Sequence, residues 1–305
     1  MFAVNVSVAD LRSEPCPPNF EVLIDRKQES QLLYGEIVQA AGEEQGAWIK
    51  VLAIEQTRFR ETTNWTGYPG WVRKIELTPV DDLSSKKSLV VIAPWVVPHN
   101  HKIALPMGTY LEKIAETDTD WVVNLIDNRK CRVSKQDVVP IPTSKDHKRQ
   151  AMLLTAQKLK GNRYTWGGRS PYKADWTTSF TSVDCSGFAD LVHRVHGIPI
   201  PRDAHDQFLV SEQIAPAHLK PADLIFLAPP GNETRPRMNH VMLYMEGDQF
   251  IDSNIKDGVV ISTGKERFGM PMSDMKNGQI VRSFSIQTNG FMEYQIYFCR
   301  IGQHA

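Results

Sequence analysis

The sequence is poor in cysteine and contains no closely spaced cysteine pair. Its 305 residues include only Cys16, Cys131, Cys185 and Cys299, which are far apart and form no Cys-x-x-Cys motif. A disulfide framework is therefore not expected, and neither is a thiolate zinc site. Free thiols fit a reducing compartment, where one of them is available as a nucleophile. We predict no metal and no other cofactor.

The sequence also lacks an excess of charge and a long hydrophobic run. Lys and Arg number 35, as do Asp and Glu, so the net charge is zero and no basic patch indicates a nucleic-acid partner. No apolar run approaches the roughly 20 residues of a membrane span. The first residues, 1–5 (MFAVN), lack the basic and apolar regions of a signal peptide. We therefore expect a cytoplasmic protein, or a secreted one if a leader has been removed.

Two polar, turn-rich stretches at 79–87 and 140–146 divide the chain into three pieces. In the first two, short apolar runs alternate with turn residues, as in small all-β barrels. The pieces also share a repeat, because Gly35 precedes Trp48 by the same spacing as Gly108 precedes Trp121. We predict two barrels, 1–82 and 83–142, in which the tryptophans serve packing.

The third piece, 143–305, reads as an α+β domain in which helices precede an antiparallel meander. A helix is predicted from Lys148 to Lys160, and a second begins near Cys185. His193 and His196 lie opposite the apolar stripe of the second helix and are expected to face solvent. The expected strands are 223–228, 240–245, 249–252, 280–286 and 294–301.

Cys185 is the strongest candidate for a nucleophile because it begins the second helix, within Asp184–Phe188 (DCSGF). The positive end of a helix favours a thiolate, and its free N–H groups can stabilise an oxyanion. A buried structural thiol is the commoner role of a single cysteine, and we assign it to the other three.

A thiolate nucleophile needs a base and a group that orients the base. His240 begins a predicted strand, and the loop 245–247 can turn that strand back. Pairing Tyr244 with Asp248 would set His240 opposite Asp252, on the same face of the sheet. A carboxylate that orients an imidazole is the arrangement of an acyl-transfer triad, although a slip by one residue would separate the two side chains.

Four segments together resemble the signature of NlpC/P60 cysteine peptidases. They are Tyr164–Gly168 (YTWGG), Asp184–Phe188, Gly197–Asp203 (GIPIPRD) and His240–Tyr244 (HVMLY), with a polar residue twelve positions after His240. With two preceding SH3b units, the pattern is similar to the γ-D-glutamyl-L-diamino acid endopeptidases of the YkfC type. The resemblance covers nearly the whole chain.

The resemblance implies a papain-like catalytic domain that cleaves the bond between γ-D-glutamate and the L-diamino acid of peptidoglycan peptides. Cys185 would be the nucleophile, His240 the base and Asp252 the third member. The positions implied in the substrate site are Tyr164, Asp184, Ser186 and Asp203. The preference for diaminopimelate or lysine and the oligomeric state stay open.

In the YkfC-type branch the first SH3b unit walls the groove, and an acidic residue with a tyrosine holds the free amine of L-alanine. Glu36 and Tyr68 are our candidates, since a buried ammonium needs a carboxylate and a second acceptor. Such a wall would restrict the enzyme to free peptides, as in recycling of the cell wall. Glu36 is otherwise a solvated strand charge.

The sequence departs from the family pattern in three places. Asp252 stands where histidine is more usual, and Ala204 follows Asp203 where serine is frequent. The stretch between Gly168 and Asp184 is longer than usual and carries three aromatic residues, Tyr172, Trp176 and Phe180. Two alternatives remain open: a peptidoglycan-binding SH3b module with a weak or inactive hydrolase domain, or a secreted hydrolase of intact wall.

Overall fold

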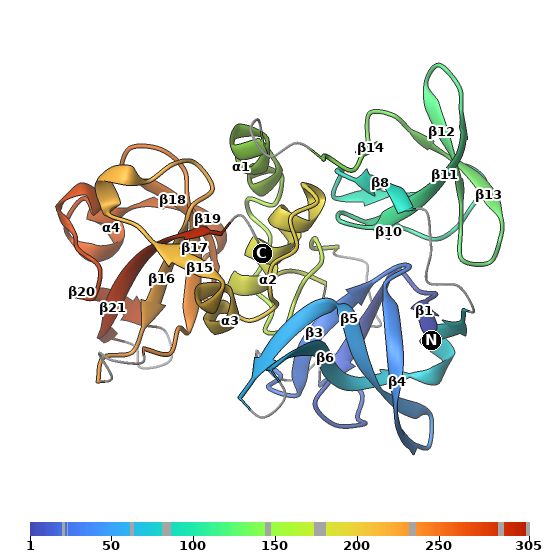
Figure 1. Ribbon diagram of the computed structural model, residues 1–305, viewed down its shortest axis with the longest axis horizontal. Coiled ribbons are helices and arrows are strands. Elements are labelled where there is room, and N and C mark those ends of the chain that lie inside the picture. The colour runs from blue at the N-terminus through green and yellow to red at the C-terminus, as the bar shows by residue number, and fades with distance from the viewer. Residues whose placement is uncertain are drawn as a thin grey trace.

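The computed structural model describes residues 1–19, 22, 24–61, 64–80, 87–143, 148–173, 181–231, 236–285 and 290–302. Figure 1 shows two helices, α1 (Lys148–Lys158) and α2 (Cys185–Val195), at the centre of the molecule. A C-terminal sheet lies to their left, and two N-terminal β-rich units lie to their right. The predicted fold class, β-rich N-terminal domains followed by an α+β domain, is confirmed.

The first N-terminal unit is a seven-stranded sheet in the order β3-β2-β6-β5-β4-β1-β7. The long hairpin of β5 and β6 dominates it, and residues 68–72 lie wholly inside β6. The strands are β1 (Phe2–Val4), β2 (Val8–Arg12), β3 (Gln28–Leu33), β4 (Ile37–Gln45), β5 (Trp48–Arg60), β6 (Asn64–Arg73) and β7 (Leu77–Pro79), with a 3₁₀ turn η1 (Lys74–Glu76) before β7.

The second unit has a five-stranded sheet, β13-β12-β11-β8-β14, and a two-stranded one, β10-β9. Gly108 has a left-handed backbone (φ +82°) before a hairpin, as Gly35 has (φ +78°) in the first unit, so the sequence repeat marks equivalent turns. Trp121 is buried and donates to the Val138 carbonyl oxygen at 2.8 Å. The strands are β8 (Lys87–Val91), β9 (Trp95–Val96), β10 (Leu105–Pro106), β11 (Tyr110–Glu116), β12 (Asp120–Asn124), β13 (Lys130–Ser134) and β14 (Val138–Pro140).

The C-terminal sheet runs in the order β15-β21-β16-β17-β18-β19, and β20 pairs with β21. Every expected strand is present, and β19 joins them at the edge. The strands are β15 (Ser211–Gln213), β16 (Leu224–Ala228), β17 (His240–Tyr244), β18 (Gln249–Asn254), β19 (Gly258–Thr263), β20 (Gln279–Ser285) and β21 (Gly290–Ile301). The remaining helices are α3 (Ala204–Leu209) and α4 (Gly264–Phe268), with 3₁₀ turns η2 (Pro216–His218) and η3 (Met272–Asp274).

Both faces of the C-terminal sheet are covered. Along β16, Leu224 and Phe226 join the core that contains α1 and α2, whereas Ile225 and Leu227 join a second cluster with Phe268 of α4. Side chains alternate between the faces of a strand, so the unbroken apolar run of β16 fits a strand buried on both sides.

Helix α2 is buried along its whole length, which corrects one prediction. His193 and His196 do not face solvent, because α1, the C-terminal sheet and the N-terminal units surround the helix. His193 Nδ1 lies 2.8 Å from the Ala189 carbonyl oxygen, and burial lowers the pKa of His193 to about 4. His196 Nε2 lies 2.9 Å from Thr155 Oγ1. Both histidines are therefore internal polar groups with partners.

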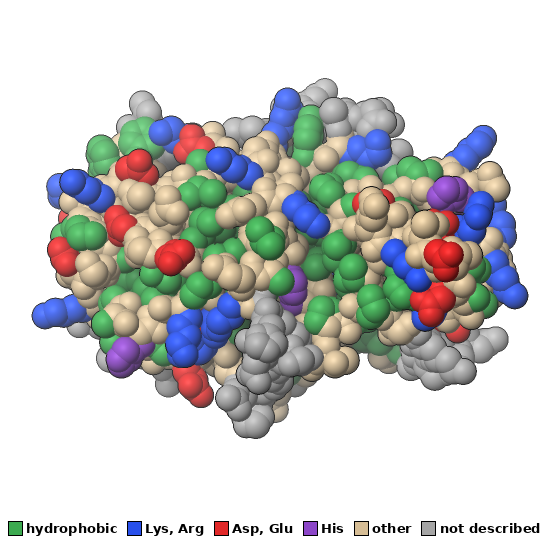
Figure 2. All heavy atoms as spheres, turned by 90° about the horizontal axis from the view of Figure 1, so that it is seen from above, with side chains coloured by type: hydrophobic (Ala, Val, Ile, Leu, Met, Phe, Trp, Pro, Cys, Tyr) green, Lys and Arg blue, Asp and Glu red, His purple; other side chains and the backbone are tan. Residues whose placement is uncertain are grey.

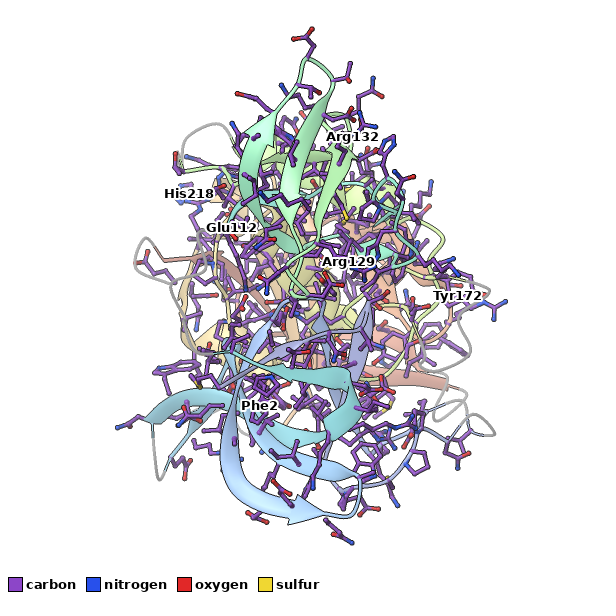
Figure 3. The ribbon with its side chains drawn as sticks, turned by 90° about the vertical axis from the view of Figure 1, so that its right-hand side faces the viewer. Phe2, Glu112, Arg129, Arg132, Tyr172 and His218 are labelled. Atoms are coloured by element: carbon purple, nitrogen blue, oxygen red, sulfur yellow. The ribbon has the colours of Figure 1, made fainter. Side chains whose placement is uncertain are left out.

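Buried ion pairs fasten the first N-terminal unit to α2. Arg169 pairs with Glu36 of the N-terminal unit and with Asp190 of α2, and all three side chains are almost fully buried. Arg194 Nη2 lies 2.8 Å from Glu55 of β5. Figure 3 shows the two N-terminal units one above the other, with the labelled Arg129 near their junction. The first N-terminal unit, which carries Tyr68, is thus held against α2.

We expect Glu36→Gln to destabilise the protein, because it leaves Arg169 and Arg194 buried with less compensating charge. Loss of one member of a buried pair costs about 3–5 kcal/mol. The matched control is Glu44→Gln, which removes an exposed partner of Lys74 and should cost about 0–1 kcal/mol. Urea unfolding measures the free energy of the first transition, and equal losses in both variants would contradict the role of Glu36.

Candidate active site

The first turn of α2 is built around Asp184, its N-cap. Asp184 Oδ1 accepts from the Gly187 N–H at 2.6 Å, and Oδ2 accepts from the Gly167 N–H at 3.0 Å. Residue 187 must be glycine here, because a Cβ would collide with the carbonyl oxygen of Gly168. Cys185 follows the cap directly and is 8 % exposed. These contacts fix the thiol at the positive end of the helix.

His240 connects the thiol to a buried carboxylate. His240 Nε2 lies 2.7 Å from Asp252 Oδ2, and Asp252 is fully buried. The neighbouring Cys185 raises the pKa of the same imidazole, and Nδ1 is the ring nitrogen that Asp252 leaves free. The structure therefore brings together all three residues that we predicted to be catalytic.

The strand register differs from the predicted one by two residues. Tyr244 pairs with Phe250 rather than Asp248, and the loop is 246–248, with Gly247 at φ +61°. His240 and Asp252 are therefore diagonal neighbours rather than directly opposite. A shift of two residues keeps side chains on the same face, whereas a shift of one would not. The expected contact forms for this reason.

The charges around His240 favour its protonated form. Burial disfavours the imidazolium, but the facing Cys185 and the hydrogen-bonded Asp252 outweigh burial and raise the pKa of His240 to about 9, from an ordinary 6.5. A thiolate beside an imidazolium is the reactive state of a cysteine hydrolase. The Asp184 side chain accepts from the Gly187 N–H, so the first-turn N–H groups of Cys185 and Ser186 are candidate donors to a developing oxyanion.

A cavity of about 650 Å³ opens at the thiol. Tyr164 and Trp166, both half-buried, line it, and Arg26 stacks over the Trp166 ring at 4.1 Å. Burial and the neighbouring Cys185 raise the pKa of Tyr164 well above its ordinary value, so its hydroxyl keeps its proton. The cavity is lined further by Leu227, Asn239, Asn254, Lys256, Arg267, Phe284, Phe291 and Tyr294.

Asp184 and Ser186, predicted in the substrate site, direct their polar atoms into the protein. Arg202 donates to both Asp184 oxygens at 2.8 and 3.0 Å and to Ser186 Oγ at 2.9 Å. Its Nε donates to Ser30 Oγ of the first N-terminal unit at 2.8 Å. Sequence reasoning missed this role of Arg202, which stands in the quoted motif directly before Asp203.

Asp203 turns away from its own helix and across the domain boundary. It is the N-cap of α3 but makes no side-chain cap bond. Instead its oxygens accept from the Tyr68 hydroxyl at 3.1 and 3.2 Å, and that hydroxyl also contacts Glu29 Oε2 at 3.1 Å. Arg58 lies 3.6 Å from Glu29 and 3.7 Å from Asp203. Two carboxylates, one guanidinium and a phenol thus converge on one point.

Glu36 is not part of this cluster, so its assignment to amine binding is corrected. It is 1 % exposed, and Arg169, Arg194 and Gln56 occupy its carboxylate. Glu29 takes the place beside Tyr68. A signal in the sequence was the four polar residues 28–31, because such a run inside a barrel strand indicates contacts with another domain or a ligand.

The stretch after Gly168 is described only in part. Tyr172 lies at one edge of the molecule (Figure 3), and its carbonyl oxygen accepts from Trp95 Nε1 of β9 at 3.3 Å. Trp176 and Phe180 lie outside the described residues. The other three thiols are free. Cys131 and Cys299 are buried as predicted, whereas Cys16 is only partly buried.

Within the described part of the chain, no group of three or more His, Cys, Asp or Glu side chains is placed to hold a metal ion. No helix among the described residues combines the length and apolarity needed to cross a membrane. Basic and acidic side chains are interspersed on the face that Figure 2 shows.

The thiol, imidazole and carboxylate have the arrangement of a cysteine hydrolase site, and comparison with known proteins identifies the domain that carries them. Residues 161–275 match the family model described as NlpC/P60 family. A gamma-D-glutamyl-L-lysine dipeptidyl-peptidase of Bacillus subtilis is 28 % identical over 233 residues, which are 75 % of this chain and 73 % of that protein. A Bacillus cereus protein of the same name is 28 % identical over 74 % of this chain and 67 % of its own length.

The fold extends the similarity to the N-terminal units. The crystal structure of an NlpC/P60 family protein from Bacillus cereus superposes with a TM-score of 0.73, covering 96 % of this chain and 98 % of that one at 23 % identity. The chain therefore carries a C-terminal NlpC/P60 domain, the domain of a cysteine peptidase family, behind β-rich N-terminal domains.

We expect Cys185→Ser to reduce peptide hydrolysis at least about a thousandfold, as loss of a nucleophile does in other hydrolases. The substitution lies at the mouth of a cavity, so the melting temperature should stay within a few degrees of the parent. Cys16→Ser, at a partly exposed free thiol, is the matched control and should keep full activity. Substantial turnover by the Cys185→Ser protein would exclude Cys185 as nucleophile.

The pKa of His240 predicts the alkaline limb of the rate profile. The imidazolium holds its proton below about pH 9, so kcat/KM for peptide hydrolysis should fall as pH rises through that value. Asp252→Asn removes a charge that raises this pKa, so the limb should move to lower pH. An alkaline limb at the same pH in both proteins would show that His240 is not the titrating group.

Proposed function

We propose that the protein is a cysteine endopeptidase that hydrolyses the γ-D-glutamyl–L-diamino acid bond of peptidoglycan peptides with a free N-terminal L-alanine. The observation that carries this proposal is the cluster of Tyr68, Glu29 and Asp203, which is joined through the neighbouring Arg202 to the first turn of α2. Asp203 follows Arg202, whose guanidinium holds both neighbours of Cys185. The names of the Bacillus relatives support the same bond.

In the proposed mechanism the Cys185 thiolate attacks the carbonyl carbon of the γ-D-glutamyl group. The first-turn N–H groups of α2 stabilise the resulting oxyanion. The His240 imidazolium then gives its proton to the departing amine of the diamino acid, and the C–N bond breaks. A water molecule, deprotonated by His240, hydrolyses the thioester, and the sulfur leaves as a thiolate, so the thiolate–imidazolium pair is restored.

The charge of the cluster suits an ammonium group. Glu29 and Asp203 supply two negative charges and Arg58 one positive charge, which leaves one negative charge for a ligand. Burial and Asp203 raise the pKa of Tyr68 above its usual range, so the phenol stays neutral as a hydrogen-bonding group. A ligand with a free amine would be held there by charge-assisted hydrogen bonds.

This selection would restrict the enzyme to small peptides. The stem of intact peptidoglycan joins L-alanine to the glycan through an amide, so that it offers no ammonium. The first N-terminal unit, which supplies Glu29 and Tyr68, acts in the proposal as the wall that excludes such stems. We propose a place in recycling of wall peptides in the cytoplasm on this basis.

The decisive substrates are L-Ala-γ-D-Glu-meso-diaminopimelate and the same peptide acetylated at its amine. Mass spectrometry should show release of L-Ala-γ-D-Glu from the free peptide alone. Glu29→Gln should raise KM about ten- to a hundredfold, the range of a lost charge-assisted bond, while Glu43→Gln, at an exposed ion pair of the same unit, should not. Equal cleavage of both peptides would refute amine recognition but keep the peptidase.

A further inference from the structure

Asp252 has a second partner, on the side away from His240. Its Oδ2 faces His240, whereas its Oδ1 accepts from Arg267 Nη2 at 3.1 Å. The carboxylate is fully buried, and the Arg267 side chain is only 18 % exposed. Both oxygens of the Asp252 carboxylate therefore face a basic side chain.

Local sequence holds Arg267 firmly in place. Helix α4 begins with a capping box, in which the Thr263 hydroxyl accepts from the Glu266 N–H and the Glu266 carboxylate accepts from the Thr263 N–H. Phe268 stacks on Phe250 of β18, with ring centroids 5.9 Å apart. These contacts fix α4 over the sheet face from which both His240 and Asp252 project, so that Arg267 reaches the carboxylate.

We propose that Arg267 is a positioning residue of the active site, which holds the second oxygen of Asp252 and so fixes the carboxylate as the third member. A buried carboxylate with one oxygen left without a partner is costly and less firmly held, and a displaced Asp252 would stabilise the imidazolium poorly. With Arg267 present, the thiolate, imidazolium, carboxylate and guanidinium sum to zero charge. A neutral third residue would need no such partner. The inference rests on the proposed catalytic roles, not on the choice of substrate.

The surroundings of Asp252 contain few other titratable groups. Among the described residues, His240 faces it from β17 and Arg267 from α4, while its pairing partner on β19 is the apolar Val260. Cys185 of α2 acts on it through His240. Removal of Arg267 therefore leaves His240 as the cationic partner of Asp252 among the described residues and takes away the partner of Oδ1.

Arg267 also lines the cavity, so a direct contact with a substrate carboxylate is the competing role. Alkylation of Cys185 by iodoacetamide separates the two, because it reports the thiolate–imidazolium pair without any peptide. It also separates failure of this inference from failure of the proposed substrate. The full-length chain is used throughout, and Arg282→Met, at an exposed ion pair with Glu293, is the matched control.

We expect Arg267→Met to move the imidazolium-dependent alkaline limb of the alkylation profile down by about one pH unit, because a less firmly held Asp252 stabilises the His240 imidazolium less. With peptide, kcat should fall at least tenfold while KM changes less than threefold. Arg267→Lys should restore most of both, and Arg282→Met should match the parent. Melting temperatures of all variants check that each protein is folded.

A double-mutant cycle makes the test decisive. In an Asp252→Asn background, Arg267→Met should cause no further shift, since the guanidinium then has no carboxylate to hold. The same shift in both backgrounds would overturn the proposal, as would an unchanged alkylation profile with a raised KM, which would make Arg267 a substrate contact. An Arg267→Met protein identical to the parent in every readout would also overturn it.

Discussion

The site depends on one guanidinium, that of Arg202. It holds the carboxylate that caps the nucleophile's helix, and it reaches Ser30 of the first N-terminal unit. Burial disfavours the charge of Arg202, but Asp184 outweighs burial and keeps its pKa above the usual range. Because the same side chain touches the helix cap and the barrel, the place of Cys185 and the place of the groove wall are set together.

Buried charges are also paired at the other contacts between the first N-terminal unit and the C-terminal domain. Arg169 and Arg194 are buried with Glu36, Asp190 and Glu55, so each charge that leaves water has a partner. Such contacts demand a fixed geometry, because a small displacement would leave a buried charge unpaired. These buried ion pairs hold Glu29 and Tyr68 opposite Asp203, although Asp203 is far from both residues in sequence.

Local patterns predicted the parts of the site that neighbours in sequence build. Cys185 at a helix start and the His240–Asp252 contact follow from periodicity, and the contact survives a register error of two residues because the face of a strand repeats every second residue. Burial by other domains was not readable in this way. His193 was expected to face solvent and Glu36 to bind an amine, because the segments that cover both side chains lie far away in sequence.

The residue at position 252 affects which residue is required at position 267. A carboxylate holds an imidazolium more strongly than a neutral group does, but it brings a negative charge into a buried position. Such a charge needs a partner at each of its oxygens, and α4 places Arg267 against the oxygen that His240 leaves free. In our proposal Asp252 and Arg267 therefore form one functional unit, in which the guanidinium holds the carboxylate and the carboxylate compensates the charge of the guanidinium. A chain with histidine at this position has no reason to keep an arginine there, so the two positions should be read as a pair.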